Sequence, residues 1–120
     1  GALTEEIAAR LSKAVITSTM VKAAVFGSDA NWGRILCAIG CEGAEFDPNK
    51  IDIIFESKKG YVEVCKDGTP LQFSEKKARS ILEDDEITII VDLQMGDKMA
   101  NAWGCDLTYE YVRINGSYRS

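Results

Sequence analysis

The spacing of the hydrophobic residues changes near the middle of this chain, and that change limits the folds it can adopt. Up to about residue 43 the apolar residues recur at the three- and four-residue intervals of helices. After the turn-forming run Asp47-Pro48-Asn49 they alternate, as in strands. Helix faces and strand faces of this kind are both buried against other elements. The pattern therefore predicts an α+β fold, with helices packed on a mainly antiparallel or mixed sheet.

Four helices are predicted from their capping residues and from the spacing of their apolar residues. The expected N-terminal caps are Thr4, Asp29 or Asn31, Ser74, and Asp106. The first helix is expected to end at about Thr19, so that residues 21–26 form a short apolar connector or strand. The second helix is expected to end in the region 40–43, which contains two glycines.

The strands are predicted from alternation and from turn residues. Residues 51–56 and 61–65 are predicted to form a hairpin around the turn 57–60, and a second tight turn is predicted at Asp67-Gly68. Residues 87–93 form a strong strand with Ile87, Ile89 and Val91 facing inward. A turn near Gly96 is expected to reverse the chain into residues 99–103, which would pair antiparallel with that strand. No linker or repeat divides residues 1–120, which are therefore interpreted as one domain.

The composition excludes several classes of function. The chain contains no histidine, so a Ser-His-Asp triad, a Cys-His dyad and a histidine-ligated zinc cannot be built within it. The 14 basic against 19 acidic residues give a net charge of −5 without a basic cluster, which argues against nucleic acid as a partner. The apolar runs are far shorter than the ~20 residues of a membrane span. We therefore expect a soluble protein with no membrane partner.

The four cysteines, at positions 37, 41, 65 and 105, do not form a recognisable framework. They contain no C-x-x-C pair, so no metal site is expected, although three disulfide pairings are formally open. We expect reduced cytosolic thiols that are mostly buried as small apolar residues. A cysteine-dependent enzyme is disfavoured, because no histidine is present to activate a thiol.

Two segments contain more unusual residues than packing requires. Residues 26–34 read Phe-Gly-Ser-Asp-Ala-Asn-Trp-Gly-Arg, and residues 102–109 read Ala-Trp-Gly-Cys-Asp-Leu-Thr-Tyr. Together with residues 21–23, 64–68, 87–93 and 112–120, they resemble the C-terminal part of the ornithine acetyltransferase family. This family is also called the bifunctional glutamate N-acetyltransferase/N-acetylglutamate synthase family of arginine biosynthesis. The resemblance covers essentially the whole chain.

The resemblance implies the self-cleaving, DmpA-like fold of that family. It also implies transfer of an acetyl group from N-acetylornithine to glutamate, with acetyl-CoA as an alternative donor in some members and no bound cofactor. The family precursor cleaves itself before a threonine, which becomes the nucleophile of the β chain. That threonine motif is absent here, and Gly1 has no nucleophilic side chain. The chain is therefore similar to the C-terminal portion of the β chain, with no catalytic residue of its own.

The implied partners are the α chain and the rest of the β chain, in a cytoplasmic α2β2 heterotetramer. Gly1 is not an initiator methionine and no secretory signal follows it, so a processed product or a fragment is expected. The alternative is an autonomous, non-catalytic α+β binding module. A segment of a larger fold should expose a large apolar patch where its partners lie, whereas an autonomous module should not.

Two residues match substrate-binding positions of the family. Asn115 corresponds to an asparagine that holds the amino-acid part of the substrate, and Ser120 corresponds to a terminal Ser/Thr in the same pocket. Gly116 would let the chain turn sharply out of the last helix to bring Ser120 there. Two plainer interpretations stay open: Asn115-Gly116 as a helix C-cap, and Ser120 as a frayed end. Asp29, Asn31 and Arg34 are interpreted as a cap and an ion pair, and both tryptophans as core residues.

Overall fold

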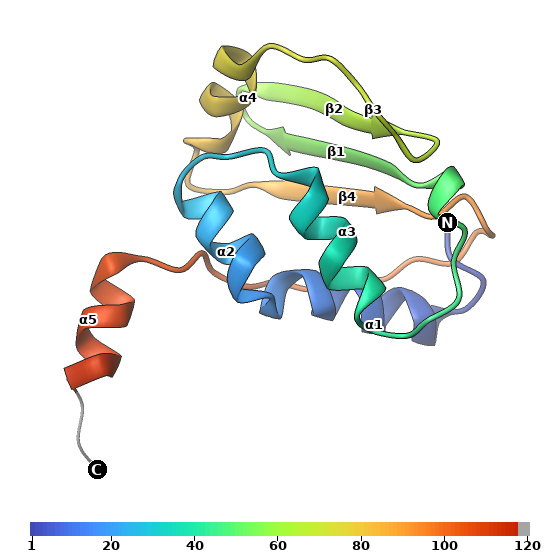
Figure 1. Cartoon of the computed structure of the whole chain (residues 1–120), viewed down its shortest axis with the longest axis horizontal. Helices are drawn as coiled ribbons and strands as arrows, with labels where there is room; N and C mark the ends of the chain where they lie inside the picture. Colours follow the sequence, from blue (N-terminus) through green and yellow to red (C-terminus); the bar gives the residue numbers. More distant parts are fainter. Residues whose placement is uncertain (118–120) are drawn as a thin grey trace.

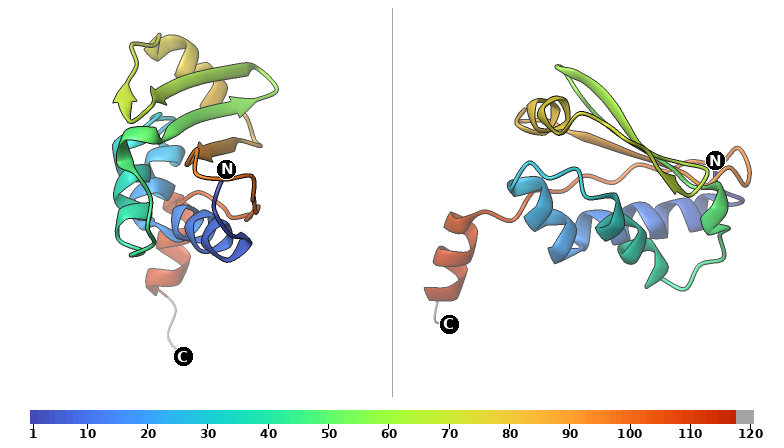
Figure 2. Two further views of the ribbon diagram at one scale, coloured as in Figure 1. Left: turned by 90° about the vertical axis from the view of Figure 1, so that its right-hand side faces the viewer. Right: turned by 45° about the horizontal axis from the view of Figure 1, so that its top comes forward.

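The computed structural model describes residues 1–117 of this chain, which form a layer of helices below an antiparallel sheet (Figures 1 and 2). The helix layer contains α1 (Glu5–Thr17), α2 (Thr19–Phe26) and α3 (Trp32–Gly40). The sheet contains β1 (Asp52–Ser57), β2 (Gly60–Lys66), β3 (Thr69–Pro70) and β4 (Thr88–Asp92), after a single turn of 3-10 helix, η1 (Pro48–Lys50). The predicted α+β class is therefore confirmed.

The sheet has the strand order β3-β2-β1-β4, and all three pairings are antiparallel. The predicted hairpin is confirmed, with Ser57 opposite Gly60 at its turn. Ile53 and Phe55 of β1 point toward the helices and are almost completely buried. They join Ile35 and Ile39 of α3 in one hydrophobic core that spans both layers. Burial of apolar surface from both layers is the main force holding them together.

The region between residues 17 and 26 differs from its prediction. Ser18 adopts an extended conformation that ends α1, and its hydroxyl accepts a hydrogen bond from the Val21 N–H, which starts α2. Residues 21–26 are therefore helical, and the predicted connector or strand is wrong. Val21 and Ala24, three positions apart, are the buried residues of α2. That spacing is helical, but it was too short a signal to identify a helix.

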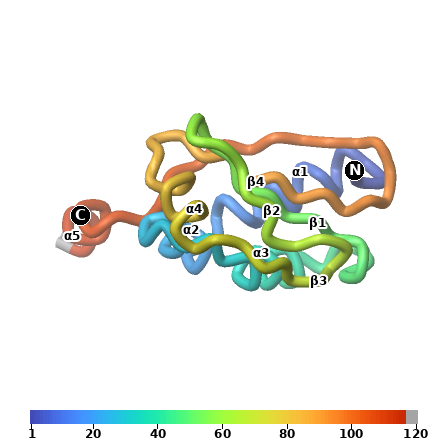
Figure 3. Tube along the Cα trace, turned by 90° about the horizontal axis from the view of Figure 1, so that it is seen from above, coloured from blue at the N-terminus to red at the C-terminus, as the bar shows by residue number. Residues whose placement is uncertain are grey.

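Residues 99–103 do not form the predicted strand beside β4. The partner of the returning chain is instead the N-terminal segment, because Ala2 and Lys98 exchange two backbone hydrogen bonds of 2.8 and 3.0 Å. The turn at Gly96 fits closely against Ala2, and a Cβ at Gly96 would meet the Ala2 carbonyl oxygen at 2.5 Å. The chain does turn back after β4, as Figure 3 shows from above, but without forming a ladder.

Two further helices complete the described residues. Helix α4 (Glu75–Leu82) begins after its predicted cap Ser74 and packs on β1 and β2. Helix α5 (Tyr109–Ser117) begins after Thr108, whose hydroxyl accepts a 3.0 Å hydrogen bond from the Tyr111 N–H. The predicted cap Asp106 is therefore wrong by two positions. Helix α5 projects away from both layers (Figures 1 and 2).

The cysteines are all unpaired, as expected, but the expectation that most of them are buried is wrong. Cys65 is buried in β2, whereas Cys37, Cys41 and Cys105 are exposed. Among the described residues, no helix is long and apolar enough to cross a membrane.

Candidate functional site

Asn115, the first of the two predicted substrate-binding residues, lies on the projecting helix α5. Its side chain is exposed, and its Nδ2 donates a 2.9 Å hydrogen bond to the carbonyl oxygen of Tyr111, one turn earlier. This bond uses one N–H of the amide and fixes the direction of the side chain along the helix. The amide oxygen takes no part in it and is suited to accept a hydrogen bond from an ammonium group.

The other predicted positions around Asn115 have different outcomes. Ser120 lies outside the described residues. Gly116 lies inside α5, and it is not among the glycines with a positive φ. The prediction that Gly116 turns the chain sharply out of the helix is therefore wrong, and so is the plainer interpretation of Asn115-Gly116 as a helix C-cap. No residue pattern indicated that α5 would continue through the glycine.

Helix α5 is held to the body of the protein at its beginning. The rings of Phe26 and Tyr109 meet edge to face with their centroids 5.1 Å apart. The Leu107 N–H donates a 3.3 Å hydrogen bond to the Lys22 carbonyl oxygen, so both contacts are made to α2. The end of α2 therefore sets the position from which Asn115 is presented.

The surface around α5 is unusually apolar. Tyr109 is 81% exposed and Trp103 is 84% exposed. The other large apolar side chains exposed in and before α5 are Met99, Tyr111, Val112 and Ile114. Side chains of this size are normally buried in a complete soluble protein when several of them lie close together in the chain. The interpretation of Trp103 as a core residue is therefore wrong, whereas Trp32 packs partly buried against the core.

The contacts of residues 26–34 are structural: they cap α3 and connect it to α2. Asn31 caps α3 by accepting a 3.0 Å hydrogen bond from the Arg34 N–H, and its Nδ2 donates to the Asp29 carboxylate. The Arg34 guanidinium donates to the Met20 carbonyl oxygen, which ties α3 to α2. The cap is confirmed, and the partner of Arg34 is a backbone carbonyl rather than a carboxylate. A 390 Å³ cleft lies between this segment and α4.

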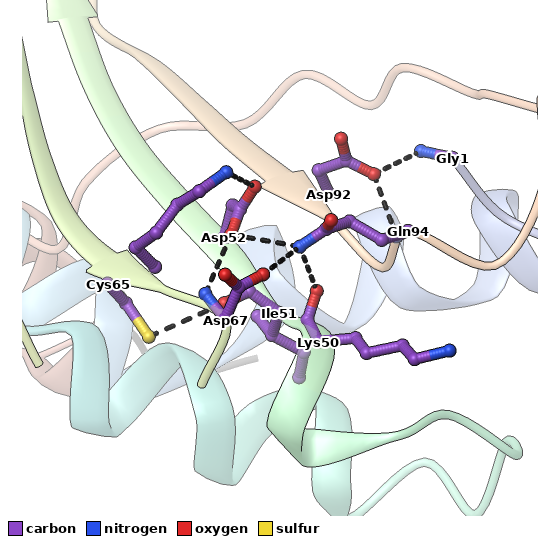
Figure 4. A network of polar contacts seen from close by, with 9 residues as sticks. Gly1, Lys50, Ile51, Asp52, Cys65, Asp67, Asp92 and Gln94 are labelled. Atoms are coloured by element: carbon purple, nitrogen blue, oxygen red, sulfur yellow. Dashed lines mark hydrogen bonds and ion pairs between the residues drawn. The ribbon is translucent and has the colours of Figure 1, made fainter. Parts of the chain in front are cut away.

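A network of polar side chains lies at one end of the sheet and was not predicted from the sequence (Figure 4). Asp52, a buried residue at the start of β1, accepts hydrogen bonds from Lys66 Nζ, the Asp67 N–H and Gln94 Nε2. The Asp52 carboxylate raises the pKa of Lys66 above its usual range. A charged residue inside an apolar strand is the signal that could have revealed this network. The hydrogen bonds of Asp52 connect β1 to β2 and to the loop after β4.

The described residues offer no metal centre of three or more ligands. No group of three His, Cys, Asp or Glu side chains in residues 1–117 is arranged to hold a metal ion. Within the same residues, α5 presents the exposed side chain of Asn115.

Comparison with known proteins identifies the family. All of residues 1–120 match the ArgJ family. This chain belongs to the ArgJ family. Relatives of high identity extend over the whole chain, and the structure has a close counterpart among solved family members. The resemblance inferred from residues 26–34 and 102–120 is thus confirmed.

Two curated ArgJ relatives illustrate the match. The chain is 57% identical over its full length to "Arginine biosynthesis bifunctional protein ArgJ 1" of Clostridium acetobutylicum, and covers 29% of that protein. It is 52% identical to "Glutamate N-acetyltransferase" of Methanocaldococcus jannaschii over 98% of its own length, and covers 30% of that protein. The chain therefore spans less than a third of the length of these relatives.

A solved ArgJ structure has the same fold. The crystal structure of the arginine biosynthesis bifunctional protein argJ from Bacillus halodurans superposes with a TM-score of 0.90 at 43% identity. The comparison covers 98% of this chain and 54% of the solved chain. The ArgJ fold of this segment is therefore established over nearly all of its length, including the helix layer and the sheet.

Proposed function

We propose that this chain is the C-terminal segment of the β chain of an acetyltransferase that moves acetyl from N-acetylornithine to glutamate. It would act as one structural unit that supplies substrate-binding and positioning residues, while the threonine nucleophile lies on another segment. The observation that carries the proposal is the full-length ArgJ family match, together with relatives named as glutamate N-acetyltransferase and as bifunctional ArgJ. The enzyme would work in the cytoplasm without a bound cofactor.

The lengths of the relatives support a precursor that is divided into two chains. This chain covers 29% of a curated ArgJ sequence but 54% of the solved argJ chain. A solved chain of that size is about half as long as a complete family member, as expected if self-cleavage separates an α chain from a β chain. The exposed apolar side chains of α5 and residues 99–103 would provide contact area for the rest of an α2β2 heterotetramer.

The geometry of α5 supports a role for Asn115 in holding the amino-acid part of the substrate. A substrate pocket must be concave, and an exposed residue on a projecting helix does not form one by itself. The pocket would therefore be completed when α5 packs against another segment of the enzyme. Asn115 would then contribute its amide oxygen from a side chain that the Tyr111 carbonyl already orients.

The test is the substitution Asn115→Ala in the complete, processed enzyme. We expect a raised KM for glutamate or N-acetylornithine, or a lower kcat, with an unchanged thermal midpoint, because the side chain is exposed and packs on nothing in the core. Asn49→Ala is a matched control, since Asn49 lies in η1 beside the sheet, at the opposite end of the molecule from α5 (Figure 1). Unchanged kcat/KM for Asn115→Ala would disprove this assignment.

Ser120 needs a separate experiment. Removal of Ser120 from the complete enzyme is expected to lower kcat/KM if its hydroxyl contacts the substrate. A deletion without kinetic cost would mean that Ser120 takes no part in substrate binding. Assays with N-acetylornithine and with acetyl-CoA as donors, run on the same preparations, distinguish an enzyme that uses one donor from a bifunctional enzyme.

The autonomous binding module fits the surface less well. Such a module would bury its large apolar side chains within its own fold. Here six of them, in and just before α5, are more than half exposed: Met99, Trp103, Tyr109, Tyr111, Val112 and Ile114. This surface favours a segment that is completed by partner chains.

A further inference from the structure

Cys37 and Cys41 lie one helical turn apart at the C-terminal end of α3. The Cys41 N–H donates a 3.1 Å hydrogen bond to the Cys37 carbonyl oxygen, and Cys41 has helical backbone angles. Residues four positions apart on a helix lie on the same side, with Cβ atoms about 5–6 Å apart. Both side chains are exposed. The two thiols therefore lie next to each other on the surface.

The opposite side of α3 holds this pair in place. Ile35 and Ile39 are completely buried in the core that joins the helices to the sheet. Cys37 lies midway between them in sequence and so points to the other side of the helix. Because the core fixes the helix, the two thiols are preorganised and little conformational freedom is lost when they bind a ligand together.

The helical geometry disfavours a disulfide between the two residues. A disulfide requires Cβ atoms about 3.5–4.5 Å apart, which is shorter than the helical spacing of about 5–6 Å. Closing the bond would distort the last turn of α3. A metal ion that binds both sulfurs needs no such distortion of the helix, because the ion itself fills the distance between the two sulfurs.

We propose that Cys37 and Cys41 form a two-thiolate site for a soft monovalent cation of the Cu(I) type. Thiolates select soft ions such as Cu(I) and zinc. A structural zinc site takes four protein ligands, whereas the described residues bring no third His, Cys, Asp or Glu to this pair. An ion that is satisfied by two sulfur ligands fits the pair best.

Binding would proceed without any change of oxidation state. The two S–H bonds break, two S–Cu bonds form, and two protons pass to the solvent. Copper enters and stays as Cu(I), and both sulfurs stay reduced, so no oxidant is needed. Since the protons compete with the cation for the sulfurs, uptake of Cu(I) should increase as the pH rises.

The test measures Cu(I) binding by the complete enzyme under anaerobic conditions, in competition with a Cu(I)-specific chelator such as bathocuproine disulfonate. The wild-type enzyme is expected to retain one more equivalent of Cu(I) than either Cys37→Ser or Cys41→Ser. Cys105→Ser is the matched control, because Cys105 is also exposed but has no cysteine one helical turn away. It should retain as much Cu(I) as the wild type.

Two results would overturn the proposal. One is equal retention by the wild type, Cys37→Ser and Cys41→Ser, which would mean that the pair binds no Cu(I). The other is an equal loss in Cys105→Ser, which would mean that uptake follows the number of exposed thiols rather than their spacing. Circular dichroism of each variant checks that the exposed substitutions leave the fold intact.

Discussion

Gly68 is a glycine whose backbone is tightly enclosed by its neighbours. It has a φ of +73°, and a Cβ there would collide with the carbonyl oxygen of Pro48 and lie 2.9 Å from the Cα of Asn49. Left-handed strain and overpacking each cost about 1–3 kcal/mol. We expect Gly68→Ala to lower the free energy of unfolding by about 2–4 kcal/mol, measured by urea denaturation.

Gly43 provides the matched control for this prediction. Its φ of +76° is nearly the same, but no atom lies within 4 Å of a Cβ built there. Gly43→Ala should therefore cost only the conformational strain, about 1 kcal/mol. Equal losses in the two variants would show that the contact with Pro48 relaxes and adds nothing.

Cys65 should differ in reactivity from the other three cysteines. Burial raises the pKa of the Cys65 thiol, and the neighbouring Asp52 carboxylate raises it further. The reactive thiolate is therefore scarce at neutral pH as well as shielded from solvent. We expect iodoacetamide to modify Cys37, Cys41 and Cys105 in the native chain, and Cys65 only after unfolding. Peptide mass spectrometry checks this order, and early labelling of Cys65 would contradict it.

At the scale of the element, one side chain starts α3. Asn31 accepts the hydrogen bond from the Arg34 N–H, while the Asp29 carboxylate accepts an exposed 3.2 Å hydrogen bond from the Asn31 side-chain amide. Loss of an N-cap typically costs about 1 kcal/mol. We expect Asn31→Ala to destabilise the chain by about that amount and Asp29→Ala by clearly less, in the same urea experiment. The reverse order would assign the cap to Asp29.

The elements that could be predicted from the sequence are those with local signals. The β1–β2 hairpin has alternating residues around a four-residue turn, and α4 has Ser74 as its cap and a buried stripe that includes Ile81. The break at Ser18 was missed because one residue both ends α1, through its extended backbone, and starts α2, through its hydroxyl. Residues 99–103 were misassigned because the returning chain pairs through Lys98 with Ala2, which lies at the other end of the sequence.

The candidate site could be predicted only in part. The identity of Asn115 came from the resemblance to the family, and its place on a helix came from the spacing of Leu107, Tyr111 and Ile114. The projection of α5 away from the core could not be inferred, because an amphipathic pattern does not say which chain covers the apolar side. The Asp52 network likewise depends on the long-range contact with Gln94.

At the scale of the whole molecule, the apolar surface is distributed unevenly. The helix layer and the sheet share one continuous core, whereas α5 is joined to them through the ring contact of Phe26 with Tyr109 and the bond from Leu107 to Lys22. A short helix with few tertiary contacts is only marginally stable in water. The stability of α5 should therefore depend on the segments that complete the enzyme.

Hydrogen exchange of the backbone amides can test this dependence. In the 120-residue chain alone, the amides of α5 should exchange much faster than those of α1, since local opening of a poorly packed helix costs little free energy. In the complete enzyme, burial of Tyr111 and Ile114 should slow exchange in α5 by at least about tenfold, while exchange in the buried turn around Leu11 of α1 should change little. If α5 exchanges equally fast in both preparations, its apolar side is not an interface, and Asn115 is not presented to the substrate through docking of this helix.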